Sequence, residues 1–119
     1  MLSSNIGLSF SIKRNQILIY KHGLKQLGNP AYIQLLYNPT ARAFIIKSCD
    51  QHTPDYIYIG KYLINNPGAS VVLYSKTLML RICSSVGGAF DNLDYCKLEG
   101  EVLPDENALI FPLSSQVGG

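Results

Sequence analysis

The 119-residue sequence predicts a mainly β domain with two short helices, built from a strand–strand–helix–strand–strand unit that occurs twice. Hydrophobic residues make up 47% of the chain and charged residues only 15%, a balance that argues against disorder. Eight tyrosines and four phenylalanines, with many isoleucines and valines, favour strands. The order of apolar segments and turn signals in residues 8–48 recurs in residues 56–113. The length fits one domain.

The first unit consists of two predicted hairpins with a short helix between them. Leu8, Phe10 and Ile12 alternate with serines, which is the period-two pattern of a half-buried strand. Gly28 and Pro30 end the helix, because glycine is a common helix stop and proline prevents continuation. The predicted segments are strands at 8–12 and 17–20, a helix around Leu24 and Leu27, and strands at 32–37 and 43–48.

Residues 49–55 are predicted to be a polar linker, after which the second unit follows the same order. Ser75 can cap a helix at its N-terminus, and Gly87-Gly88 ends that helix. The predicted segments are strands at 56–59 and 71–74, turns at 65–68 (Asn-Asn-Pro-Gly) and 104–107, a helix with Leu78, Met79, Ile82 and Val86 at helical spacing, and strands at 95–103 and 108–113.

The two units also match at individual residues. Ile17-Leu18-Ile19-Tyr20 corresponds to Val71-Val72-Leu73-Tyr74, and Leu24 corresponds to Leu78, each four residues after a tyrosine. The matching strand pair at the end of each unit is Ala43-Phe44-Ile45-Ile46 and Ala108-Leu109-Ile110-Phe111. We interpret this as a degenerate internal repeat. Chance similarity between strand-rich segments is the alternative explanation.

The first unit resembles the AbrB-type swapped-hairpin domain, which also occurs in MazE-like antitoxins and in SpoVT and MraZ proteins. Ile19-Tyr20-Lys21 stands at the family's step into the helix, Leu24 to Gly28 at its short helix ending in "LG", and Tyr32 to Lys47 at its second hairpin. Residues 56–113 match only in pattern. Tyr20 and Tyr74 replace the proline usual at the step.

The resemblance implies both a fold and a function. Two tandem units would interleave into one AbrB-like β-barrel, a pseudo-dimer within a single chain as in MraZ proteins. Each short helix would pack on strands contributed largely by the opposite half. The implied function is that of a small bacterial DNA-binding or transcription-regulatory protein.

Charge is distributed unevenly along the chain, although its net value is only +2. Residues 1–50 carry six Lys and Arg against one acid, a net +5, whereas residues 51–119 carry four against seven, a net −3. A basic half is suited to double-stranded DNA. The predicted DNA-binding residues are Lys13, Arg14, Lys21 and Lys25, with Lys61 and Lys76 as second-half counterparts. Attraction between the halves, or ordinary solvated turn and helix residues, is the alternative.

A second hypothesis keeps the same fold and gives it a different task. The acidic second half and the scarcity of arginine favour a protein-interaction module, antitoxin-like or other, with no DNA contact. An enzyme is not expected, because no nucleophile, base and orienting group are recognisable together. The sequence predicts no cofactor, and it leaves open whether the chain assembles into a homo-oligomer.

Metal binding and a membrane location are also not expected. Cys49, Asp50, His52 and Asp55 lie close in the linker, but their spacing fits no standard metal site, so a plain polar linker is favoured. Three cysteines without paired spacing suggest reduced thiols in a cytoplasm. The apolar runs are too short to cross a bilayer, and residues 1–5 lack the pattern of a secretory signal.

Overall fold

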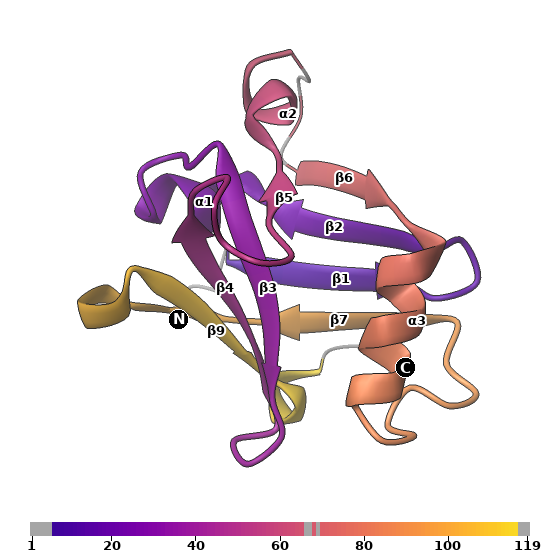
Figure 1. Cartoon of the computed structure of the whole chain (residues 1–119). Coiled ribbons are helices and arrows are strands. Elements are labelled where there is room, and N and C mark those ends of the chain that lie inside the picture. Colours follow the sequence, from indigo (N-terminus) through magenta and orange to yellow (C-terminus); the bar gives the residue numbers. More distant parts are fainter. Residues whose placement is uncertain (1–5, 66–67, 69, 117–119) are drawn as a thin grey trace.

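Two antiparallel sheets make up most of the molecule (Figure 1). The computed structural model describes residues 6–65, 68 and 70–116; residues 1–5, and residues 66–67 of the predicted 65–68 turn, lie outside that part. Sheet A has the strand order β6-β2-β1-β7 and sheet B the order β5-β3-β4-β9-β8. The strands are β1 (Gly7–Ser11), β2 (Gln16–Tyr20), β3 (Tyr32–Asn38), β4 (Ala43–Cys49), β5 (Ile57–Tyr58), β6 (Ser70–Tyr74), β7 (Tyr95–Glu99), β8 (Glu101–Leu103) and β9 (Ala108–Pro112). The prediction of a mainly β fold is confirmed.

Both hairpins of the first half form as the alternating pattern predicts. In β1–β2, Leu8 lies opposite Ile19, and in β3–β4, Leu35 lies opposite Ile46, so each hairpin turns one apolar face inward. Asn15 closes the first turn at a φ of 52°. Asparagine tolerates this left-handed conformation better than most residues. The sequence therefore indicates both where the strands lie and where they turn.

Three α-helices form within the described residues, whereas the sequence predicted two. They are α1 (Lys21–Gln26), α2 (Gly60–Asn65) and α3 (Lys76–Ser85), and two 3₁₀ turns are η1 (Pro104–Glu106) and η2 (Leu113–Ser115). None of these helices combines the length and the apolar character needed to span a membrane. α2 was missed because it begins with glycine, a poor helix former, and ends in the predicted 65–68 turn, whereas α1, of equal length, was indicated by Leu24 and Leu27. The residue before β3 fixes the N-terminal end of α2, because the N–H groups of Ile59 and Gly60 both donate to the carbonyl oxygen of Ala31.

The strand predicted at 95–103 is divided at Gly100, where the chain passes from sheet A to sheet B. β7 pairs with β1 in sheet A, and β8 pairs with β9 in sheet B. A Cβ atom on residue 100 would lie 2.5 Å from Cδ1 of Phe111 and 2.7 Å from the carbonyl oxygen of Ile110. Only glycine lets the backbone approach β9 this closely. The passage of the chain from sheet A to sheet B therefore requires that residue 100 has no side chain.

The closed AbrB-like barrel predicted from the sequence is wrong. Sheet A ends at β6 and sheet B ends at β5, and within the described residues these edge strands pair with β2 and β3 but not with each other. A two-residue β5 offers too few backbone groups to continue sheet A. The strands therefore form two open sheets, with α2 and a surface groove between their edges.

The core lies between the two sheets and is closed at one end by α3 (Figure 1). Phe10 of sheet A and Phe44 of sheet B have ring centroids 5.1 Å apart, and Phe90, after α3, lies 5.4 Å from Phe10. Met79 and Ile82 of α3 are buried in the same cluster. Burial of this apolar surface is the main stabilising contribution, roughly 25 cal/mol per Å².

Several contacts join the first half of the chain to the second. The strand pairs β1–β7, β2–β6 and β4–β9 all combine one strand from each half. Gly23 of α1 lies against β9, since a Cβ atom there would meet Cδ1 of Leu109 at 2.9 Å. α3 and β3 together line a depression of about 130 Å³ that includes Leu36 and Ile82. Each of these two helices thus contacts strands of the opposite half.

Candidate nucleic-acid interface

The turn between β1 and β2 brings three of the six predicted DNA-binding residues together. Lys13 and Arg14 occupy the turn and are exposed. The N–H of Ser75 donates to the carbonyl oxygen of Asn15 at 3.0 Å, so exposed Lys76, the next residue, lies beside the turn. We call Lys13, Arg14 and Lys76 the basic turn. It combines residues from both halves of the chain, which sequence order alone would not show.

One carboxylate lies close to the basic turn. Nζ of Lys13 is 3.2 Å from Oδ1 of Asp94, and both side chains are at least 70% exposed. An ion pair in this environment contributes between 0 and about 1 kcal/mol. Asp94 therefore lowers the positive potential of the turn without holding Lys13 away from an anion.

The other three predicted residues lie at the opposite end of sheet A. Lys21 and Lys25 of α1 line a groove of about 310 Å³ together with Gly60 and Leu63 of α2. Lys61 follows Gly60, and its Nζ lies 5.1 Å from the ring centroid of Tyr62. β2 separates this group from the basic turn, and its five residues span about 16 Å. The six cations therefore form two groups rather than one site.

A tyrosine-lined groove lies between the edges of the two sheets, formed by side chains for which the sequence favoured strand packing over a base-stacking surface. We define the tyrosine groove by Tyr56, Tyr58, Tyr62 and Tyr74; it has a volume of about 440 Å³ and reaches α3 at Arg81. The exposed fraction is 71% for Tyr74, 45% for Tyr56 and 46% for Tyr58. Tyr56 and Tyr58 alternate with Ile57 and Ile59 in the sequence, a period-two pattern typical of a strand.

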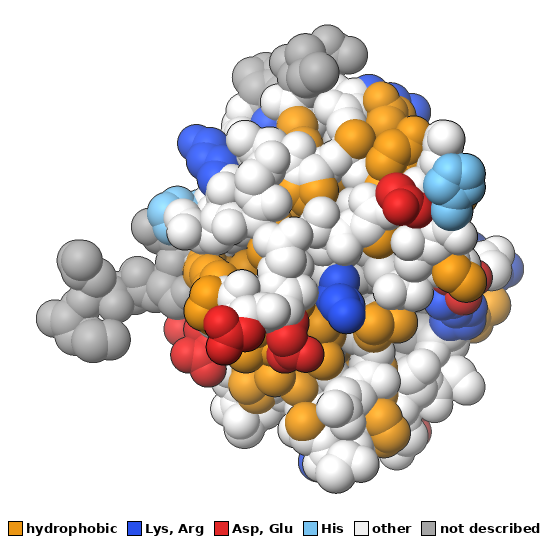
Figure 2. Space-filling model, turned by 60° about the vertical axis from the view of Figure 1, so that its left-hand side comes forward, with side chains coloured by type: hydrophobic (Ala, Val, Ile, Leu, Met, Phe, Trp, Pro, Cys, Tyr) orange, Lys and Arg blue, Asp and Glu red, His pale blue; other side chains and the backbone are white. Residues whose placement is uncertain are grey.

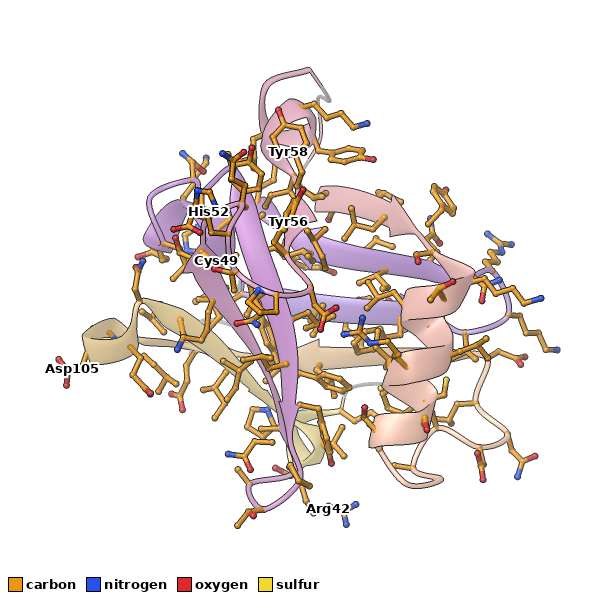
Figure 3. The ribbon with its side chains drawn as sticks, in the orientation of Figure 1. Arg42, Cys49, His52, Tyr56, Tyr58 and Asp105 are labelled. Carbon is orange, nitrogen blue, oxygen red and sulfur yellow. The ribbon has the colours of Figure 1, made fainter. Side chains whose placement is uncertain are left out.

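Neighbouring groups hold the rings of the tyrosine groove in place. Tyr32 of β3 contacts both Tyr56 and Tyr58, with ring centroids 5.4 and 5.3 Å apart. Tyr58 also packs on Gly60, where a Cβ atom would come within 2.9 Å of the ring. Nε2 of Gln16 donates to the hydroxyl of Tyr74 at 3.1 Å. The tyrosines around β5 are labelled in Figure 3.

An ion pair crosses the lower part of the groove. A guanidinium nitrogen of Arg81 on α3 lies 3.6 Å from Oδ1 of Asp55 in the linker. Both side chains are more than half exposed, so the pair is weak and can reopen for a charged ligand.

The linker side chains that could ligate a metal do not converge. Figure 3 shows Cys49 and His52 beside β3, and Oδ1 of Asp50 accepts the backbone N–H of His52 at 2.8 Å. This bond is an Asx turn, which shapes the linker locally. Within residues 6–65, 68 and 70–116, no three His, Cys, Asp or Glu side chains lie close enough to hold a metal ion.

The two cysteines beside the core are poor nucleophiles near neutral pH. Burial raises the pKa of the Cys96 thiol to about 11. Burial and the nearby Asp91 carboxylate also raise the pKa of Cys83. Because the thiolate is the reactive form, both groups stay protonated and weakly reactive near pH 7.

Several other charged side chains lie away from the basic turn. Figure 3 shows Arg42 at the tip of the β3–β4 hairpin and Asp105 in η1. Figure 2 shows acidic side chains gathered over β8 and η1, where Glu101, Asp105 and Glu106 are exposed. The acidic second half thus has its own surface at the far end of sheet B.

Comparison of the chain with models of known protein families, with curated proteins and with solved structures finds no significant match. The resemblance to AbrB-type domains therefore depends on the residues of the chain alone and stays a prediction, and a functional assignment has to be argued from the surfaces described above.

Proposed function

We propose that this protein is a small DNA-binding protein that contacts the phosphate backbone through the basic turn. One observation carries the proposal: Lys13, Arg14 and Lys76, from two distant parts of the chain, meet at one end of sheet A. Clustered cations on a protruding turn can approach phosphates, which supply most of the affinity in non-specific binding. A regulatory role in transcription is the further step that the resemblance to AbrB-type proteins suggests.

The start of α3 adds to the positive potential at this end. The first turn of α3 contains no acidic residue, and Lys76 is its first residue. The N-terminus of a helix carries a partial positive charge that attracts phosphate. The helix dipole, Lys76 and the two cations of the β1–β2 turn therefore act in the same direction.

We further propose that the two halves are interleaved repeats related by a pseudo-two-fold axis. The register of β2–β6 supports this, because equivalent residues exchange places across the pair. The pairs are Ile17 with Leu73, Leu18 with Val72, and Ile19 with Val71. Ile17 corresponds to Val71 in the repeat, and Ile19 corresponds to Leu73. A two-fold rotation that exchanges the repeats therefore converts the first of these pairs into the last.

The β4–β9 pair follows the same rule. Its pairs include Phe44 with Phe111, Ile45 with Ile110, and Ile46 with Leu109. With Phe44 equivalent to Leu109 and Ile46 to Phe111, the outer pairs again exchange, and Ile45–Ile110 lies on the axis. Two independent strand pairs with self-equivalent registers favour a duplicated unit over chance similarity.

Salt-dependent DNA binding tests the function. We expect the protein to bind labelled duplex DNA with an affinity that falls as the salt concentration rises. The double substitution of Lys13→Ala and Arg14→Ala should reduce the magnitude of the slope of log K against log salt by about 1–2. Fluorescence anisotropy titrations at several salt concentrations would measure both slopes.

A matched control removes the same charge elsewhere. Arg42→Ala combined with Lys47→Ala takes two cations from the β3–β4 hairpin, away from the basic turn, and should leave the slope near that of the unchanged protein. Absence of duplex binding even at low salt would refute the proposal. If the two double variants have equal slopes of log K against log salt, the basic turn is not the part of the protein that contacts the phosphates.

A protein-interaction module is the second candidate. The exposed carboxylates at β8 and η1 favour a basic protein surface as partner, and Leu80 on α3 is an exposed apolar side chain. Recovery of one stoichiometric protein partner after nuclease treatment, combined with no DNA affinity in the titration, would favour this candidate over the first.

A further inference from the structure

We infer that the tyrosine groove binds unpaired bases of a single-stranded nucleic acid. The inference rests on the proposed function, because it adds a preferred ligand form to a protein already proposed to bind DNA. Its starting point is that Tyr56, Tyr58 and Tyr74 are 45–71% exposed along one groove. Large aromatic side chains grouped at the surface mark binding sites more often than single exposed apolar residues do.

Neighbouring side chains contact three of these rings in the absence of a ligand. Tyr32 supports Tyr56 and Tyr58 through ring contacts, and Gln16 holds the hydroxyl of Tyr74. A tyrosine ring that is already ordered loses little conformational entropy when a base stacks on it. Base–aromatic stacking also tolerates any sequence, since every base presents a π-face.

Charge at the groove favours a polyanion over an uncharged ligand. Lys61 lies over the ring of Tyr62 at one end, and Lys76 stands between Ser75 and Thr77, which line the other end. Arg81 lies in the wall, and Asp55 is the one acid among the residues that line the groove. Arg81 and Asp55 balance each other within the lining, so the net +2 comes from Lys61 and Lys76, which flank the groove. A proline-rich peptide, the other common ligand of aromatic grooves, needs no such cations.

The groove also connects the two groups of cations at the ends of β2. Lys76 belongs to the basic turn, and Lys61 belongs to the group beside α1. A single strand lying along β6 could therefore keep its phosphates near both groups while its bases contact the tyrosines. A duplex cannot use the tyrosines in this way, because its base faces are stacked on one another.

Intrinsic tyrosine fluorescence provides a direct test. The chain contains no tryptophan, so tyrosine emission can be followed without interference. We expect oligothymidine or oligouridine to quench this emission and to bind more tightly than a duplex of equal length. The double substitution of Tyr56→Ala and Tyr74→Ala should weaken single-strand binding by at least about fivefold for each stacked ring.

Two control variants keep the test decisive if the alanine variant folds poorly. Tyr56→Phe keeps the ring and leaves the hydrogen bond between Gln16 and Tyr74 intact, so it should retain single-strand affinity. Leu80→Ala removes an exposed apolar side chain outside the groove and should also leave the affinity unchanged. Loss of affinity in the phenylalanine variant would overturn the stacking model. So would quenching by a proline-rich peptide in place of the oligonucleotides.

The outcomes separate this inference from the proposed function. The protein could bind duplex DNA through Lys13 and Arg14, show no preference for single strands, and be unaffected by the Tyr→Ala substitutions. This result would overturn the groove inference, but it would leave the proposed role of the basic turn in DNA binding unchanged. Absence of binding to both forms at low salt would overturn both.

Discussion

Single residues decide how the two sheets are connected and what the surface can bind. Gly100 gives the chain room to pass from β7 to β8 beside Phe111 and the backbone of β9. Tyr74, at the free edge of sheet A, presents most of its ring to solvent. Residue type alone would not single out either position, since the chain contains ten glycines and eight tyrosines, and only the fold shows where each one acts.

A Gly100→Ala substitution should destabilise the protein by about 2–4 kcal/mol, because the added methyl group overlaps a packed ring and a carbonyl oxygen. Gly28→Ala is a useful comparison. Gly28 has a φ of +82° and no atom within 4 Å of an added Cβ, so it tests backbone strain alone, which costs about 1 kcal/mol. Denaturant unfolding would measure both. If the two variants lost equal free energy of unfolding, the close contact between Gly100 and β9 would not contribute beyond backbone strain.

At the level of elements, most strands could be predicted from the sequence and most of their partners could not. The alternation around Leu8 and Phe10 and the turn at Asn15 locate the β1–β2 hairpin. The division at Gly100 could not be seen, because glycine within a strand pattern does not say which sheet follows. Helix α2 was hidden by the glycine at its start, and the tyrosine groove forms only when β5 and β6 come together from two different sheets.

Helix α3 offers a prediction at this scale. Its cap is the hydroxyl of Ser75, which accepts the backbone N–H of Leu78 at 3.1 Å. Ser75→Ala should lower the free energy of unfolding by about 1 kcal/mol, and Ser75→Asp should retain most of it. Ser85→Ala, at the exposed end of the same helix, should change stability by less than about 0.5 kcal/mol. Thermal unfolding would measure all three variants, and a Ser75→Ala protein as stable as Ser85→Ala would contradict the role of the cap.

The whole molecule depends on contacts between its two halves. The β1–β7, β2–β6 and β4–β9 pairs each need both halves, and Gly23 of α1 packs against Leu109 of β9. Without residues 56–116, β1, β2 and β4 would each lose a neighbouring strand, and the core would lose the cover of α3 and Phe90. The prediction of a single domain made of two dependent halves rests on these pairs.

Residues 1–50 produced alone should therefore not fold as a monomer. We expect no cooperative thermal transition in this fragment at low concentration, measured by circular dichroism. Mixing it with residues 51–119 should restore a transition if the halves associate as they do in the chain. A cooperative transition in the isolated fragment would contradict the mutual dependence of the halves.

The position of β9 between β4 and β8 has a consequence for synthesis of the chain. β4 pairs with β3 but lacks its second neighbour until residues 108–112 have left the ribosome, so the nascent chain exposes an unpaired strand edge while the residues between β4 and β9 are made. Long-range pairing of this kind also slows folding, because the closing loop spans about half of the chain. We expect ribosome-associated chaperones to shield the emerging β3–β4 hairpin during that interval.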